Sequence, residues 1–391
     1  MMKPKGNRRS RARTGGTVLF GLLSVVVLLA LLAGCGSSSS SSSSASTEAS
    51  ESAETTESAE TSEGAEAEEG EEAPAADEEE GAGEGKPYNG PEAKLPTSYE
   101  PPEATGGKCV LGYQNIYGAI PGLKVQQEGA EKEASNLGCK LIALDDQLNL
   151  TTQVNNFNQL LAQNVEGIVV FPLVPKALGP SVAQASSRGI PVMSNSTPPA
   201  VTEPLPKGFA ARILQGFDEI AFLRARYVAE QNPGAKFATM GLAQPVASLV
   251  YFTERAKYWG EKFGLEYEGD IDAQEDNPGS ASNAASALFS KYPETEALFA
   301  YNDNSAVAAG AVAKASGKEV EICGNNGQSA AVNAIENGTM ACTGYTNFEP
   351  MGEQLVRGLY RLIHGEELPE TAKAEVSLIT KENASEITPI G

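Results

Sequence analysis

The feature that most constrains the fold is an alternation of short apolar runs with helix-like segments, from about residue 108 to residue 383. The run EGIVVFP has consecutive apolar residues, as expected for a strand whose two sheet faces are both covered. The segment TTQVNNFNQLLAQNV has apolar residues at helical spacing, with Thr151 or Thr152 as the expected N-cap. Strand, helix and strand in succession predict βαβ units and therefore a parallel sheet.

The same alternation starts again after the stretch ARILQGFDE and continues through KFATMGLA, ALFAYND, VEICGNN and MACTGYTN. About 285 residues follow the N-terminal region, which is long for a single hydrophobic core and sufficient for two. The sequence therefore predicts an α/β protein made of two successive halves.

Several segments in this order resemble type 1 periplasmic binding proteins of the ribose and sugar class, among them GAEKEASNLGCKLIALDDQ, NFNQLLAQNVEGIVVFPLVPKALGP and FAYNDNSAVAAGAVAKASGKEVEICGNNG. The resemblance covers the chain from about Lys108 to Asn383 and implies two doubly wound parallel-sheet lobes joined by three crossovers. The crossovers are expected near 216–218, 345–347 and 371–374. The N-terminal lobe is then formed by 107–216 and 347–372, and the C-terminal lobe by 217–346 and 373–391.

The N-terminus has the layout of a secretory signal, expected over residues 1–34: a basic start, an apolar run over 17–32 and then small residues. The apolar run is shorter than the roughly 20 residues that a spanning helix needs. The following Leu-Ala-Gly-Cys resembles a bacterial lipobox, which implies cleavage before Cys35 and a lipid on its sulfur. A plain signal peptide or a signal anchor with an incidental cysteine is the alternative.

Residues 35–106 are expected to form the lipidated cysteine and a disordered tether. Eight consecutive serines are followed by sequence rich in Glu, Ala, Ser and Gly, with almost no aliphatic or aromatic side chains to offset the entropy of ordering. Much of the net charge of −22, from 51 acidic and 29 basic residues, comes from this region. No basic patch is visible, so we expect no nucleic-acid partner.

The resemblance implies a ligand site where strands of both lobes end, because ligands of parallel α/β sheets bind outside the carboxyl ends of strands. Asn302 matches a ligand-binding Asn of the family, and Asp303 is expected to cap the next helix. Charged residues common in sugar binders are replaced here by amides and hydroxyls, which favours a small, neutral polar ligand. For Asn195 and Asn325, a role in stabilising turns is an equal alternative. The predicted ligand-binding residues are Tyr113, Gln114, Asn115, Tyr117, Asn195, Ser196, Thr253, Asn302, Asn326 and Thr346.

Four cysteines follow the lipobox. In the implied fold, Cys109 and Cys139 lie on neighbouring strands of one lobe, and Cys323 and Cys342 on neighbouring strands of the other. An exported protein can keep disulfides, so two are expected. Four buried thiols that act as small hydrophobes are the alternative.

No pattern for catalysis is present: the chain has one histidine, His364, and no HExxH, GxSxG, CxxC or P-loop. We expect no enzyme activity, no cofactor and no metal. The predicted function is that of a monomeric, lipid-anchored solute-binding protein that delivers a sugar-like ligand to an ABC permease at the outer face of the cytoplasmic membrane. A sensory lipoprotein that presents its ligand to a membrane receptor kinase is the alternative.

Overall fold

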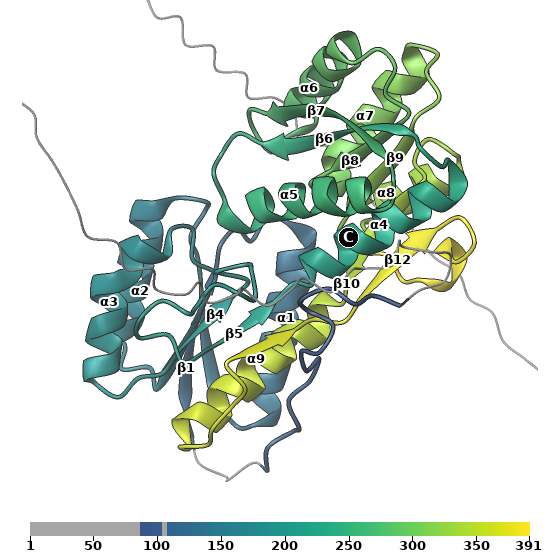
Figure 1. Cartoon of the computed structure of the whole chain (residues 1–391). Helices are drawn as coiled ribbons and strands as arrows, with labels where there is room; N and C mark the ends of the chain where they lie inside the picture. The colour runs from purple at the N-terminus through teal and green to yellow at the C-terminus, as the bar shows by residue number, and fades with distance from the viewer. Residues whose placement is uncertain (1–86, 104–107) are drawn as a thin grey trace, which may run out of the picture. The chain divides into compact units, whose positions relative to one another are not determined.

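The computed structural model describes residues 87–103 and 108–391. The predicted signal peptide, Cys35 and the tether up to residue 86 lie outside the described residues. The described chain forms two six-stranded sheets with helices between the strands, which confirms the predicted α/β class and its two lobes (Figure 1).

The first sheet has the strand order β11-β5-β4-β3-β1-β2, and all of its neighbours are parallel. Its strands are β1 (Val110–Asn115), β2 (Lys140–Asp145), β3 (Gly167–Val170), β4 (Val192–Asn195), β5 (Ala211–Leu214) and β11 (Thr371–Lys373). Its helices are α1 (Pro121–Asn136), α2 (Leu150–Ala162), α3 (Pro175–Ser187) and α9 (Phe348–Ile363). Helices α1 and α9 cover one face of the sheet, and α2 and α3 cover the other (Figure 1).

Two glycines let α1 and α9 approach so closely that their backbones touch. A Cβ atom on Gly352 of α9 would lie 1.8 Å from the Gln126 carbonyl oxygen, and one on Gly129 of α1 would lie 2.2 Å from that of Glu349. Any larger residue at either position would push the helices apart. This contact fixes the start of α9, which borders the space between the lobes.

The second sheet has the order β12-β10-β9-β8-β6-β7, in which only the β10–β12 pair is antiparallel. Its strands are β6 (Lys236–Leu242), β7 (Glu266–Ala273), β8 (Ala297–Ala300), β9 (Glu321–Asn325), β10 (Cys342–Thr346) and β12 (Val376–Thr380). Its helices are α4 (Phe217–Gln231), α5 (Ala247–Lys262), α6 (Pro278–Lys291), α7 (Asp303–Ala315) and α8 (Ser329–Glu336), followed by a 3₁₀ turn, η1 (Ala384–Glu386).

The chain passes between the sheets three times, after β5, after β10 and after β11. At the first crossing, Gly216 has φ +75°, and a Cβ there would lie 2.6 Å from Val376 Cγ1, so the position requires glycine. Lys373 still pairs with Leu214 in the first sheet. The boundary expected after residue 372 therefore lies one residue too early.

Residues 87–103, here called the strap, correct the expectation of a disordered tether up to residue 106. The strap packs on both lobes: the Tyr88 hydroxyl donates to Asp218 of α4, and the Tyr99 backbone N–H donates to the Gln354 side chain of α9. Glu92 and Tyr99 are buried. Between them, the Lys373 N–H donates to the Pro96 carbonyl at 3.0 Å. Tyr88 and Tyr99 provide the apolar contact area that the rest of the expected tether does not have.

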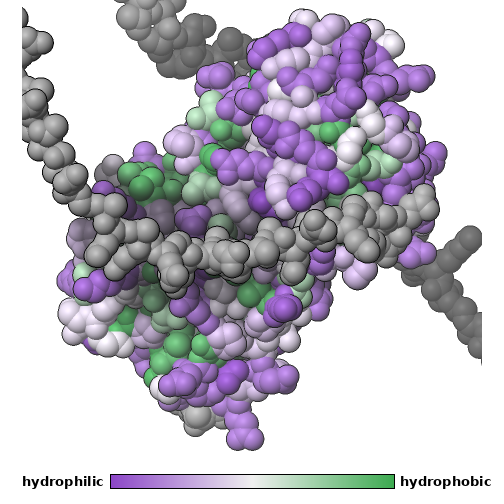
Figure 2. All heavy atoms as spheres, in the orientation of Figure 1, coloured by the Kyte–Doolittle hydropathy of each residue, from purple (hydrophilic) through white to green (hydrophobic). Residues whose placement is uncertain are grey.

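The surface of the described body is mixed. On the face drawn in Figure 2, hydrophilic residues cover most of the second lobe, and apolar residues form small, separate patches. Of the helices in the described part of the chain, none has the length and apolar character needed to cross a membrane.

Candidate functional site

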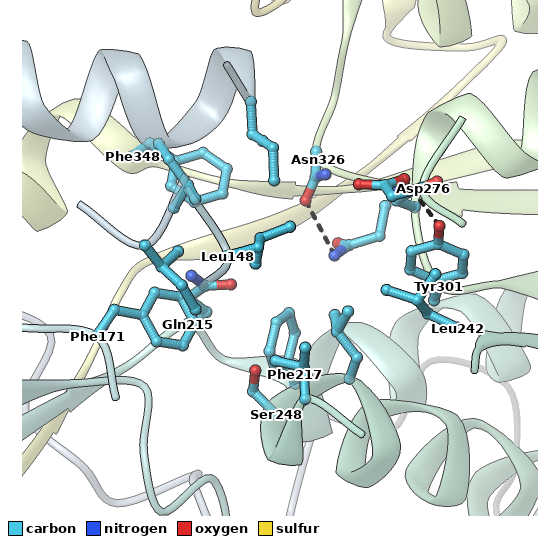
Figure 3. A pocket seen from close by; sticks show the side chains of 17 residues that line it. Leu148, Phe171, Gln215, Phe217, Leu242, Ser248, Asp276, Tyr301, Asn326 and Phe348 are labelled. Atoms are coloured by element: carbon cyan, nitrogen blue, oxygen red, sulfur yellow. Dashed lines mark hydrogen bonds between the residues drawn. The ribbon is translucent and has the colours of Figure 1, made fainter. Parts of the chain in front are cut away.

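A cleft lies between the two lobes, where strands of both sheets end (Figure 3). It contains about 640 Å³ of space not filled by atoms, part of which is open to solvent. The described residues that line it are Ile116, Ile120, Leu123, Leu148, Phe171, Gln215, Phe217, Leu242, Val246, Ser248, Leu249, Asp276, Tyr301, Asn302, Asn325, Asn326 and Phe348.

Apart from Gln215 at the first crossover, the first lobe lines the cleft with apolar side chains. They come from the loops after β1, β2 and β3 and from the beginnings of α1 and α9: Ile116, Ile120, Leu123, Leu148, Phe171 and Phe348. Most of them also belong to one apolar cluster, which extends beyond the cleft to Tyr117 and Ile390. We call these six residues the apolar wall. It offers a ligand contact area and no hydrogen-bonding side chain.

Leu148 of this wall is held in place by an unusual backbone. Gln147 and Leu148 have φ values of +55° and +52°, in the left-handed region that non-glycine residues seldom adopt. The Leu148 N–H donates to the Ile116 carbonyl at 2.9 Å, and Asn149 Oδ1 then caps α2 by accepting from Thr152 N at 2.9 Å. Asn149, and not the expected Thr151 or Thr152, is the N-cap. Strained backbone of this kind is concentrated at functional sites, so Leu148 is a candidate for contact with a ligand.

The second lobe lines the opposite side with polar groups that follow β7, β8 and β9. The Tyr301 hydroxyl and the Asn302 amide both donate to Asp276 Oδ1, each at 2.8 Å (Figure 3). Burial, and then the nearby Asp276 carboxylate, raise the pKa of Tyr301, so the phenol stays protonated as a donor. We call Asp276, Tyr301 and Asn302 the polar cluster.

Two buried polar atoms at the cleft have no hydrogen-bond partner among the described residues: Ser248 Oγ, near the start of α5, and Asn325 Oδ1, at the end of β9. The next residue, Asn326, has φ +116°, and its Oδ1 accepts from Asn325 Nδ2 at 3.1 Å. Buried polar atoms without partners cost free energy, so these two atoms are suited to a ligand.

Three of the predicted first-lobe residues face the interior of the lobe. The Tyr113 hydroxyl donates to Gln126 Oε1 at 3.0 Å, and the Gln114 amide donates to Asp146 Oδ1 at 2.9 Å. Asn115 stabilises the loop that follows β1, because its Oδ1 accepts a hydrogen bond from Tyr117 N at 3.1 Å. None of the three lines the cleft, whereas the Tyr117 side chain packs beside the apolar wall.

Four further predicted residues are also outside the cleft lining. Asn195 donates to Gln126 Oε1 at 2.7 Å, and Ser196 donates to Asn195 Oδ1 at 2.9 Å, both inside the first lobe. Thr253 donates to the Leu249 carbonyl at 3.0 Å and faces a separate groove of the second lobe. Thr346 is fully buried at a crossover and donates to the Gln215 carbonyl at 3.2 Å.

Asn302 and Asn326 do line the cleft. Asn302 has a second role that was assigned to its neighbour: its Oδ1 accepts from Ser305 N at 2.9 Å, so Asn302 is the N-cap of α7. Asp303 is fully buried instead and accepts from Gln328 N at 2.7 Å and from Thr343. Burial raises the pKa of Asp303 to about 7.

Sequence reasoning missed Asp276, Gln215 and Ser248. Asp276 lies in the loop QEDNPG, three residues after the end of β7, so its position beyond a strand end in the second lobe was a usable signal. Gln215 lies beside the first crossover. Ser248 lies on a helix, where polar residues face solvent in most proteins, and nothing in its neighbours marks it.

The cysteines form the two expected pairs. Cys109 is bonded to Cys139, each just before one of the neighbouring strands β1 and β2, and Cys323 to Cys342 on neighbouring strands of the second sheet. The Cα atoms lie 4.5 Å and 4.6 Å apart. His364 ends α9, where Nδ1 lies 2.7 Å from the Tyr360 carbonyl, at a distance from the cleft lining. Within 87–103 and 108–391, no cluster of His, Cys, Asp or Glu has the arrangement of a metal site.

Comparison with known proteins gives a family and several relatives. The family described as periplasmic binding protein domain matches residues 115–367. The ribose import binding protein of Bacillus subtilis is 25% identical over 265 residues, which cover 65% of this chain and 82% of the relative. That of Haemophilus influenzae is 26% identical over 274 residues, with 65% and 86% covered.

Solved structures support the same architecture. A solute-binding protein of an ABC transporter from Mycobacterium smegmatis, with bound glycerol, has a TM-score of 0.63 at 22% identity and covers 73% of this chain and 99% of its own. One from Bacillus halodurans, with bound myo-inositol, has a TM-score of 0.64 at 24% identity, with 72% and 97% covered. At these identities the likeness establishes the fold.

Proposed function

Because this chain belongs to the periplasmic binding protein family, we propose that it captures a small solute between its two lobes and delivers it to an ABC importer. The family consists of binding proteins, so the chain is a binding protein and not an enzyme. The observation that carries the proposal is the cleft, which presents a polar cluster and two unpartnered buried polar atoms between the lobes.

The geometry suits capture by closure. The cleft lies beside two of the crossovers: Gln215 and Phe217 line it at the first, and Phe348 directly after the second. Rotation of the lobes about these short segments would bring the apolar wall and the polar cluster against the same ligand. Closure would also replace water on the ligand with protein contacts. Ribose import by the relatives favours a ligand of monosaccharide size.

Mass spectrometry of small molecules released from the purified chain on denaturation tests capture. We expect one dominant compound, which raises the melting temperature of the emptied protein when it is added back. Uptake tests delivery: cells without this chain should lose uptake of that compound at low concentration. Intact uptake together with loss of a transcriptional response would favour the sensory alternative. No released compound and no stabilisation by any solute would contradict the binding function.

The location outside the cytoplasm and the lipid on Cys35 remain part of the proposal. The family is periplasmic by description, and the basic, apolar and small-residue layout before Cys35 supports export. Replacement of Cys35 by Ser should move the protein from the membrane fraction to the soluble fraction in high salt. A serine variant that stays with membranes would exclude the lipid anchor and leave capture of the solute untouched.

A further inference from the structure

Asp276 is the one charged side chain among the described residues that line the cleft. It is half-buried, and both of its donors, Tyr301 and Asn302, bind the same oxygen, Oδ1. No described residue donates a hydrogen bond to Oδ2. A carboxylate in a cleft that closes over its ligand requires a partner for the second oxygen, because a buried charge without one is costly.

No described Lys, Arg or His lines the cleft, and the two arginines packed nearest the second sheet bind elsewhere. Arg224 is fully buried and donates to the carbonyls of Ala300 and Gly324, at 2.8 Å and 3.2 Å, on the protein side of β8 and β9. Arg255 of α5 donates to Asp218 on the side of the strap. Neither arginine lines the cleft, so the positive charge that complements Asp276 has to come with the ligand.

The free acceptor of the polar cluster matches a donor-only head group. Asp276 Oδ2 accepts and does not donate, and both donors among the described residues bind Oδ1 instead. A protonated amine brings three donors and no acceptor, so it satisfies such a site without leaving an atom of its own unpaired. A sugar hydroxyl brings one donor together with acceptor lone pairs.

The apolar wall indicates the chemical character of the rest of the ligand. Six side chains of the first lobe face the cleft without a polar atom, and Phe217, Leu242, Val246 and Leu249 extend this surface at the crossover and on the second lobe (Figure 3). A ligand hydroxyl pressed against it on closure would lose its water without gaining a partner. Each such loss lowers affinity by about 5- to 150-fold. A ring or a branched chain would gain affinity from the same contact.

We propose, on the premise that the chain is a solute-binding protein, that its ligand is a small organic cation: an apolar ring or branched chain against the apolar wall, with a protonated amine on Asp276. Ligand specificity then divides between the lobes. The first lobe selects the body of the molecule by shape, and the second selects its head by charge. The neutral, sugar-like ligand expected from the sequence is the competing outcome.

Matched probes test the proposal on the purified chain after dialysis to remove bound ligand. Tyramine and phenethylamine carry the amine; tyrosol and 2-phenylethanol have the same skeletons with a hydroxyl in its place; D-ribose and myo-inositol lack an apolar body. We expect each amine to bind at least about 10-fold more tightly than its alcohol, by calorimetry and thermal shift. The sugars should bind more weakly than the amines.

The variant Asp276→Asn isolates the charge, because its Oδ1 still accepts from Tyr301 and Asn302. Amine affinity should fall by about 10- to 100-fold, and alcohol affinity should stay within about twofold. Asp270→Asn is the matched control: Asp270 is an exposed carboxylate on β7 that also accepts from a tyrosine hydroxyl, that of Tyr267 at 3.2 Å, and it lies outside the cleft. This control should leave amine affinity unchanged.

A second variant tests the apolar wall. Leu148→Asn suits the left-handed backbone at this position, since Asn adopts positive φ more readily than Leu, so folding should be preserved. It places a polar amide in the wall, and phenethylamine affinity should fall by about 10-fold. Unchanged affinity would mean that the ligand does not touch the wall.

The outcomes separate the ligand class from the function. If neither amine binds at about 10 mM, or if Asp276→Asn binds amines as well as the wild type, the inference is overturned. Binding of D-ribose or myo-inositol in that case would preserve the solute-binding function with a neutral ligand. Failure of all six probes, together with no compound released on denaturation, would remove the proposed function as well.

Discussion

The two walls of the cleft come from lobes of the same architecture, yet they treat their polar side chains in opposite ways. In the first lobe, Tyr113 and Gln114 near the end of β1 and Asn195 at the end of β4 hydrogen-bond inside the lobe. In the second, Tyr301 and Asn302 occupy a comparable strand end and reach the cleft. The difference teaches that a polar residue near a strand end faces the cleft when no buried acceptor inside the lobe draws its side chain inward.

In the first lobe, two buried side chains accept the hydrogen bonds of these polar residues. Gln126 of α1 accepts from Tyr113 and Asn195, and Asp146 accepts from Gln114, Gln153 and Asn156. Burial raises the pKa of Asp146, while these three donors act in the opposite direction. The second lobe has no equivalent acceptor behind Tyr301 in the described chain, and its donors meet Asp276 at the cleft itself.

The largest effect is expected from breaking the first-lobe network at Gln153. This fully buried side chain bonds Asp146 Oδ2, the Phe171 carbonyl and Leu173 N at 2.8–2.9 Å. Gln153→Leu leaves three buried groups unpaired and should lower the free energy of unfolding by about 3–5 kcal/mol. Urea unfolding measures the loss.

The matched change in the second lobe is Tyr301→Phe, which removes one donor at the edge of the cleft. It should cost no more than about 1 kcal/mol. Equal losses in the two variants would contradict the contrast between an internal network and a cleft-facing one.

Each lobe also has its own disulfide. Removing one disulfide at a time compares how much stability each bond contributes to its lobe. The sequence separations are 30 residues for Cys109–Cys139 and 19 for Cys323–Cys342. In the chain-entropy model each closure contributes about 3 kcal/mol, the longer a few tenths more. Double Cys→Ala variants of either pair should lose about this much stability. Thiol counting on the denatured, unreduced protein should find none of the four reactive; four reactive thiols would contradict both bonds.

A smaller effect follows from the strap, whose second-lobe end is charged. Burial, and then the neighbouring Asp218 carboxylate, raise the pKa of Glu92 to about 8 from its ordinary 4.5. Between these values the folded chain keeps a proton that the unfolded chain loses, so stability should fall as pH rises from about 4.5 to about 8. We expect the free energy of unfolding to fall steadily over this range.

The isosteric variant Glu92→Gln should remove this slope and be more stable than the wild type at pH 8. The first-lobe end of the strap, at Tyr99, provides the control: Tyr99→Phe should leave the slope unchanged. Parallel stability curves for the wild type and Glu92→Gln would show that the carboxyl titrates normally in the folded protein.

The fold was predictable because the spacing of apolar residues along the sequence shows directly which side chains are buried. EGIVVFP became β3, with all four strand residues buried, and the repeated pattern gave two sheets. The strap was missed because its composition resembles the acidic region before it. Two tyrosines, Tyr88 and Tyr99, were the local signal that part of this region packs on the body.

The site was predictable only at the level of loops. Strand ends pointed to Asn302 and Asn326, which line the cleft, but the sequence does not say which polar side chains hydrogen-bond with one another. Gln126 and Gln153 lie on helices, at positions that look like solvent-facing amides, and they satisfy the first-lobe residues. The carboxylate of the cleft was missed because the charged residues common in sugar binders were expected to be replaced by amides and hydroxyls in this chain.

The smallest effect is expected at Asn302, and it separates the two roles of one side chain. Asn302 Oδ1 caps α7 through Ser305 N, while Nδ2 donates to Asp276. Asn302→Ala loses both bonds and should cost about 1 kcal/mol of stability. Asn302→Ser keeps a capping oxygen and loses the amide donor, so its stability should stay within about 0.5 kcal/mol of the wild type.

Both variants leave Asp276 with one donor instead of two, so both should bind the tightest of the six probes less well, by about fivefold. Thermal melting measures the capping role of Asn302, and calorimetry on the same samples measures its role in ligand binding. If Ser restores stability and affinity together, Asn302 acts on the ligand only by holding α7. If both variants keep wild-type affinity, Asn302 has no part in the polar cluster, and Tyr301 alone orients the carboxylate that distinguishes the second wall from the first.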